Sequence, residues 1–298
     1  MPFIVSKFFC GLRGAAFGLS IALMSVKTAS RAAATTVPVL LRERDGEIAI
    51  LVLNRPQARN SLSEALLNAL SAAWTDIAAD KSIRAVVLAA NGPAFCAGHD
   101  LKELTARRGD ADGGRAYFKH IMTTCSAMMQ QIVNLPQPVI AAVHGVASAA
   151  GCQLVASCDL AIASQAARFA TPGVNIGLFC STPMVALARN VARKHAMEML
   201  LTGNMVAAAD AARIGLINRV VAPGEERTSA LALAQEIAAK SSYVLKIGKQ
   251  AFYRQAEIGL AEAYNHASEV MTENMMARDA EEGICAFIEK RDPNWEDR

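Results

Sequence analysis

Short apolar runs alternate with helical patterns along the chain from about Val37 onward. The run IAILVLN at 48–54 predicts a buried strand. Apolar residues then recur every three or four positions, as in an amphipathic helix; they are Leu62, Leu66, Leu70, Trp74 and Ile77. Ser61 followed by Glu64 has the spacing of a capping box, which predicts that the helix opens at Ser61.

The alternation of strand and helix continues through the first two thirds of the chain. Strands are expected at 85–90, 138–143 and 159–163, with a helix over 117–133. Such a repeat favours an α/β fold with covered sheets.

After Ser181 the pattern changes to helices with few strand signals. Short helices are expected at 184–191, 195–201 and 207–214, then a strand at 217–221 and three longer helices over 225–290. We therefore divide the chain into a core over 37–222 and a helical region over 223–298, of the kind that commonly packs on a neighbouring subunit.

The N-terminal segment, residues 1–36, differs in composition from the rest. It is basic and rich in Ala and Ser, and no acidic residue occurs before Glu43. These features are typical of a mitochondrial transit peptide. A cleaved secretory signal, or a disordered or misassigned start in a bacterial chain, remains an alternative. We expect the mitochondrial matrix for a eukaryotic protein and the cytoplasm for a bacterial one. The uncharged run 14–26 is too short to span a bilayer, so no stable membrane insertion is expected.

Composition narrows the class of protein further. Of 298 residues, 53% are hydrophobic and 19% charged, the balance of a packed globular protein. The net charge of +3, from dispersed Lys and Arg, argues against a nucleic-acid groove but suits a small anionic ligand. The seven cysteines form no C-x-x-C pair, which disfavours a metal site and predicts mostly buried thiols in a reducing compartment.

Two loops combine small residues with a turn from a strand toward a helix. They are AFCAGHDLKEL at 94–104 and HGVASAAGCQLVASCD at 144–159. Backbone amides at helix N-termini carry partial positive charge, so two converging loops can hold an oxyanion. The alternative is that the small residues only allow close packing of strand and helix.

Taken together, motifs along nearly the whole chain after residue 45 resemble the crotonase (enoyl-CoA hydratase/isomerase) family. These motifs, in order, are NRPQARNSLS, AFCAGHDL, PVIAAVHGVASAAGCQLVASCDLAIAS, FATPGVNIGL and GICAFIEKRDP. A subgroup whose pattern reads GHDLKEL, AAAGCQLVASCD and ATPGVN-GLFCSTP fits best. The resemblance implies a crotonase-type ββα spiral core with a helical C-terminal trimerisation region, and a homo-oligomer that is a trimer or a hexamer.

The resemblance also implies a binding site for acyl-CoA. The backbone amides of His99 and Ala150 would hold the thioester oxygen and stabilise an enolate. Ala149 and Ala150 replace a more usual Gly-Gly, and with ordinary helical dihedrals this should cost little. Coenzyme A would be part of the substrate and not a separate cofactor. Its binding residues would be Lys102, Phe287 and Lys290, the last two from a neighbouring subunit, although a single lysine can equally be a solvated surface charge.

The acid–base residues depart from the family pattern. The two glutamates of a hydratase correspond here to Gln153 and Gly173, which supply no carboxylate. Ordinary hydratase activity should therefore be very weak. Cys180 and Ser181, near the position of the acid in other branches, also supply none, and Cys180 is expected to be buried and inert. His99 is expected to contribute its amide in preference to its ring. Structural roles are expected for Asp100, His120, His144 and Asp159.

Two functions remain open at this point. The chain could be an enzyme of the lyase or isomerase class that acts on fatty acyl-CoA thioesters through its oxyanion hole. It could instead be a non-catalytic acyl-CoA-binding or regulatory protein of lipid metabolism. The fold does not decide between them, because function depends on the site.

Overall fold

The larger of two β-sheets forms the centre of the protein. The computed structural model describes residues 37–298, and the predicted targeting segment 1–36 lies outside the described residues. Six strands have the order β1-β2-β3-β5-β7-β10. β1 and β2 form an antiparallel hairpin, and the other neighbours run parallel. The bounds are β1 Leu40–Asp45, β2 Ile48–Leu53, β3 Ala85–Ala90, β5 Val139–Val143, β7 Leu160–Ser164 and β10 Arg219–Val221.

A smaller sheet of four strands has the order β4-β6-β8-β9. Its strands are β4 Ala94–Cys96, β6 Val146–Ser148, β8 Arg168–Ala170 and β9 Val206–Ala207. The pairs β3/β4, β5/β6 and β7/β8 each place one strand in the larger sheet and the next in the smaller, before the chain turns into a helix. This repeat is the predicted ββα spiral, so the predicted α/β fold is confirmed.

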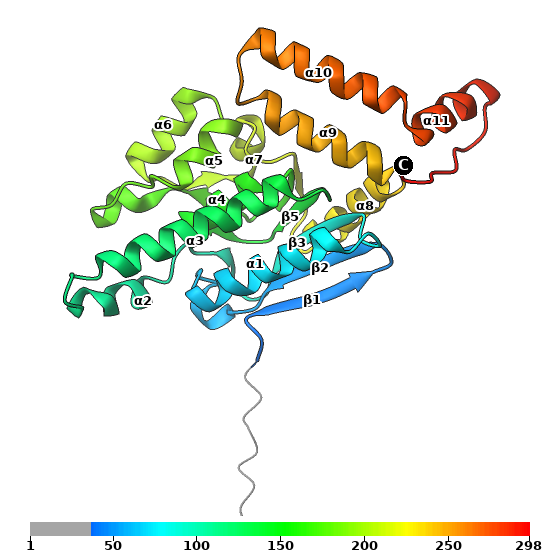
Figure 1. Ribbon diagram of the computed structural model, residues 1–298. Coiled ribbons are helices and arrows are strands. Elements are labelled where there is room, and N and C mark those ends of the chain that lie inside the picture. The colour runs from blue at the N-terminus through cyan, green and yellow to red at the C-terminus, as the bar shows by residue number, and fades with distance from the viewer. Residues whose placement is uncertain (1–36) are drawn as a thin grey trace, which may run out of the picture. The chain divides into compact units, whose positions relative to one another are not determined.

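Helices cover both faces of the larger sheet (Figure 1). On one face, α1 (Glu64–Ala79) and α3 (Arg115–Asn134) pack their apolar sides against strand residues such as Leu51. On the other face, α8 (Glu226–Ala238) covers alternate strand residues, among them Ile50. Successive strand residues point to opposite faces, so strands buried on both sides are apolar throughout.

The start of α1 differs from the prediction. Ser63 is the N-cap, and its side chain accepts a hydrogen bond from the Leu66 amide at 3.2 Å. Ser61 instead donates to the carboxylate of Asp100 at 3.1 Å, so the predicted capping box is wrong. The physical reason is a tertiary contact, because residue 62 pairs with residue 99 in an isolated β-bridge and holds this segment extended.

Shorter helices fill the middle of the chain. They are α2 Leu101–Ala106, α4 Ala150–Ser157, α5 Pro183–Asn190, α6 Arg193–Thr202 and α7 Ala208–Arg213. The 3₁₀ helix η3, Pro172–Ile176, follows β8. Within residues 37–298, no helix has both the length and the apolar composition needed to cross a bilayer.

The C-terminal region contains four long helices where three were predicted. After α8 come α9 (Ser242–Gln255), α10 (Leu260–Met275) and α11 (Arg278–Glu289). The helix breaks at Ala277, which is extended, and the buried carboxylate of Asp279 accepts hydrogen bonds from the amides of Glu296 and Asp297. Tail contacts thus separate α10 from α11, which no local pattern indicated. α9 and α10 bury no residue completely (Figure 1).

Candidate functional site

The two loops that the sequence singled out meet at the N-terminus of α4. A methyl group added to Gly98 would lie 3.0 Å from the Ala149 Cβ and 3.4 Å from the Ala150 amide nitrogen. One added to Gly151 would lie 2.1 Å from the carbonyl oxygen of Cys96. These separations leave no space for a side chain, so glycine is needed at both positions for the loops to approach this closely.

The two predicted oxyanion donors are both free to bind a ligand. Leu62 donates to the carbonyl of Gly98 at 2.7 Å and accepts from the amide of Asp100 at 3.2 Å. In this parallel bridge the N–H of His99 points away from Leu62. Ala150 opens α4, where first-turn amides have no acceptor within the helix. Among the residues that the structure describes, neither N–H has a hydrogen-bond acceptor.

Ala149 has an unusual backbone conformation. Its φ of 50° and ψ of −118° lie in a region that glycine occupies far more readily. Residues held in such regions carry strain of about 1–3 kcal/mol. The expectation of ordinary helical dihedrals is therefore wrong for Ala149. Its amide donates to the carbonyl of Ala170 at 2.9 Å, which helps to hold the turn.

A partly buried ion pair fixes the loop that carries His99. The Arg55 guanidinium lies 2.9 Å from the Asp100 carboxylate, and the two side chains are only 17% and 12% exposed. Burial tends to raise the pKa of Asp100, but hydrogen bonds from Arg55 and Ser61 outweigh it and the pKa is lowered. Asp100 also caps α2 by accepting from the Lys102 amide at 3.1 Å. Its predicted structural role is confirmed, whereas Arg55 was missed.

Neither glutamate position supplies an acid or a base. Gln153 lies one turn into α4, 5% exposed, and its side-chain oxygen has no hydrogen-bond partner. Gly173 lies in η3, where an added methyl group would be 2.9 Å from the carbonyl oxygen of Leu178 and 3.0 Å from the Cys180 sulfur. The chain thus lacks a carboxylate at both positions and has no free space for a side chain at the second.

The remaining titratable groups near these loops are held neutral. Burial lowers the pKa of the His99 imidazole, and both ring nitrogens are buried without a partner. Burial raises the pKa of the Cys180 thiol, whose sulfur accepts a hydrogen bond from the Gly173 amide at 3.3 Å. A protonated, hydrogen-bonded thiol is a poor nucleophile, in agreement with the expected inertness of Cys180.

The predicted coenzyme-binding residues lie far apart within one chain. Lys102 is exposed in the first turn of α2. Phe287 is exposed on α11, and Lys290 is exposed at its C-cap. Figure 1 shows α2 and α11 at opposite ends of the molecule. A site that used all three residues would need two subunits.

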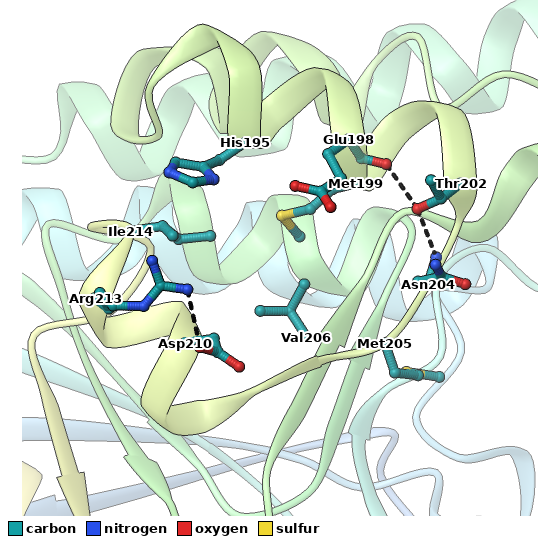
Figure 2. A pocket seen from close by; sticks show the side chains of 10 residues that line it. All are labelled: His195, Glu198, Met199, Thr202, Asn204, Met205, Val206, Asp210, Arg213 and Ile214. Carbon is teal, nitrogen blue, oxygen red and sulfur yellow. Dashed lines mark hydrogen bonds and ion pairs between the residues drawn. The ribbon is translucent and has the colours of Figure 1, made fainter.

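Two surface hollows lie away from these loops. The first, of about 220 Å³ between α6, β9 and α7, is shown in Figure 2; there Arg213 pairs with Asp210 at 3.0 Å, and Thr202 bonds to the carbonyl of Glu198. The second, of about 360 Å³, lies beside α9. Neither is lined by any of the predicted site residues.

A buried ion pair at the second hollow holds α9 on the core. The Lys249 ammonium donates to the carboxylate of Asp159 at 2.6 Å and to two backbone carbonyls, and Tyr253 donates to the same carboxylate at 2.9 Å. Burial raises the pKa of Asp159 and lowers that of Lys249. The predicted structural role of Asp159 is confirmed.

Comparison with known proteins agrees with the motifs. A model of the enoyl-CoA hydratase/isomerase family matches residues 43–298. Human mitochondrial enoyl-CoA hydratase domain-containing protein 3 is 47% identical over 258 residues, covering 87% of this chain and 83% of that protein.

Solved structures show the same similarity. An enoyl-CoA hydratase from Mycobacterium smegmatis is 53% identical, with a TM-score of 0.83, over 87% of this chain and 99% of that one. The crystal structure of human enoyl-CoA hydratase domain-containing protein 3 is 46% identical, with a TM-score of 0.82, over 86% of this chain and all of that one. The predicted resemblance is confirmed, and this chain belongs to the enoyl-CoA hydratase/isomerase family.

Proposed function

We propose that this protein binds acyl-CoA thioesters with the thioester oxygen between the amides of His99 and Ala150, and that it hydrates enoyl-CoA only slowly. The observation that carries the proposal is the pair of unoccupied N–H donors where the two loops meet. Such donors stabilise negative charge that develops on a carbonyl oxygen, and each is worth about 10² to 10³ in rate.

The slow rate follows from the missing acid–base groups. Hydration requires one group to activate water and another to deliver a proton, and each contributes about 10² to 10⁴ in rate. Gln153 has no usable pKa, and Gly173 has no side chain. Crotonyl-CoA hydration should therefore be several orders of magnitude slower than in a two-glutamate hydratase.

Coenzyme A would be part of the substrate, held by Lys102 of one subunit and by Phe287 and Lys290 of the next. A homo-oligomer, either a trimer or a hexamer, would bring these residues together. Several relatives are named mitochondrial, which supports a mitochondrial location with residues 1–36 as a transit peptide, and a role in fatty acid metabolism. A non-catalytic acyl-CoA-binding or regulatory role is the second candidate, favoured by the loss of both carboxylates.

Calorimetry with octanoyl-CoA, coenzyme A and octanoate tests the binding proposal. We expect octanoyl-CoA to bind most tightly, because the loops and the lysines then act on one ligand. Replacing Ala150 by lactic acid exchanges its N–H for an ester oxygen and should weaken octanoyl-CoA binding about 2- to 10-fold, the worth of one hydrogen bond. The same exchange at the exposed Ala72 of α1 is the control. Absence of binding to any acyl-CoA would refute the proposal.

A further inference from the structure

Buried polar atoms without a partner gather around the candidate site. Among residues 37–298, six side chains contain such an atom: Trp74, His99, Gln137, Gln153, Thr171 and Asn274. Three of these, His99, Gln153 and Thr171, belong to segments that meet at the N-terminus of α4. Folded proteins pair nearly all their buried polar atoms. The concentration of exceptions at this point therefore indicates polar groups that a ligand would satisfy.

Main-chain contacts place these three residues around the two oxyanion amides. Thr171 follows Ala170, whose carbonyl accepts from the Ala149 amide at 2.9 Å. The Gln153 amide donates to the carbonyl of Ala149 at 3.0 Å, one helical turn away. Helical side chains lean toward the helix N-terminus, so the Gln153 carboxamide lies over the turn that holds Ala150. His99 carries the other oxyanion amide.

The chemistry of Gln153 and Thr171 selects among acyl groups. The unpaired carboxamide oxygen of Gln153 accepts a hydrogen bond, and the Thr171 hydroxyl can donate one. Both residues are at least nine-tenths buried, with exposures of 5% and 0%. A hydrocarbon chain beside them leaves both groups unpaired and desolvated, which is unfavourable. A neutral hydroxyl on the acyl chain would donate to Gln153 and accept from Thr171.

We infer that the site prefers 3-hydroxyacyl-CoA over the saturated acyl-CoA of the same length, with Gln153 and Thr171 as the residues that determine this specificity. The inference rests on the proposed acyl-CoA binding and adds the class of acyl group. The third carbon is two bonds beyond the thioester carbon, so a ligand whose oxygen lies between His99 and Ala150 places its hydroxyl near the first turn of α4.

Competition binding with octanoyl-CoA and each enantiomer of 3-hydroxyoctanoyl-CoA tests the inference on the full chain. We expect one enantiomer to bind about 2- to 10-fold more tightly than octanoyl-CoA for each hydrogen bond formed. Thr171→Val and Gln153→Leu should each reduce this ratio, chiefly by weakening the hydroxylated ligand. Thr171→Ser keeps a hydroxyl and should retain the preference. Thr75→Val, on the exposed face of α1, is the matched control.

Each outcome separates the two proposals. Equal binding of octanoyl-CoA and both 3-hydroxyoctanoyl-CoA enantiomers to the wild type overturns the specificity and leaves acyl-CoA binding intact. A preference that survives both Thr171→Val and Gln153→Leu overturns the assignment of these residues. Failure of every acyl-CoA to bind refutes the proposed function and this inference with it. Thermal melting of each variant verifies that it is folded.

Discussion

The backbone of Ala149 is the clearest case of strain at a single residue. We expect Ala149→Gly to raise the free energy of unfolding by about 0.5–1 kcal/mol, because relief of strain exceeds the entropy that glycine loses on folding. Urea denaturation measures the change. Ala156→Gly, inside α4, is the matched control and should lose about 1 kcal/mol. A loss of stability in both variants would show that Ala149 is not strained.

His99 should make stability depend on pH. Burial lowers its pKa in the folded protein, so below the unfolded value of 6.5 the unfolded chain binds more protons than the folded one. The contribution of His99 is complete above pH 6.5 and decreases as the pH falls toward the folded pKa. Unfolding of the wild type and of His99→Gln at pH 7.5, 6 and 5 tests this, and the variant should lose less stability on acidification. Parallel profiles would contradict it.

Restoring the glutamates separates chemistry from space. Gln153→Glu alone should recover little crotonyl-CoA hydration, because a second acid–base group is still missing. Gly173→Glu was expected to add more if the pocket had room, but its Cβ would lie 2.9 Å from the carbonyl oxygen of Leu178. We now expect the double variant to lose stability without regaining ordinary rates. Steady-state kinetics and thermal melting test both effects, and a stable, fast double variant would show that η3 can move.

At the scale of elements, the segment before α1 positions the loop before α2. Asp100→Asn weakens the pairing with Arg55 and should lower the free energy of unfolding by about 1–3 kcal/mol, with weaker octanoyl-CoA binding because the His99 amide is less well held. Asp76→Asn removes the exposed pair with Arg42 and should change stability by less than about 1 kcal/mol. Similar stability changes in the two variants would show that the Arg55 pair does not anchor the loop.

At the scale of the whole molecule, the last helices leave large apolar side chains uncovered. Those on α9 to α11 include Phe252, Leu260, Tyr264, Met271, Phe287 and Ile288. Contiguous exposed apolar surface marks a site of association. Light scattering should give three or six times the chain mass of 31.6 kDa, and Phe287→Asp should shift the population toward smaller species. A monodisperse wild-type monomer at micromolar concentration would contradict the predicted assembly.

The sequence by itself determined the order of elements, the family and the absence of catalytic carboxylates. The strand predicted at 85–90 has those same bounds, and the helix predicted at 117–133 lies within α3. These properties depend on residue type and local periodicity, which the chain expresses without reference to distant contacts. The missing acids at 153 and 173 needed only an alignment of motifs.

Only the tertiary structure decided how the site is held and what fits in it. The conformation of Ala149, the closed space at Gly173, the partner of Arg55 and the cap at Ser63 all depend on contacts between segments remote in sequence. Even the break before α11 depends on the C-terminal tail. Backbone strain and free space arise from the packing of several elements at once, so local pattern does not reveal them.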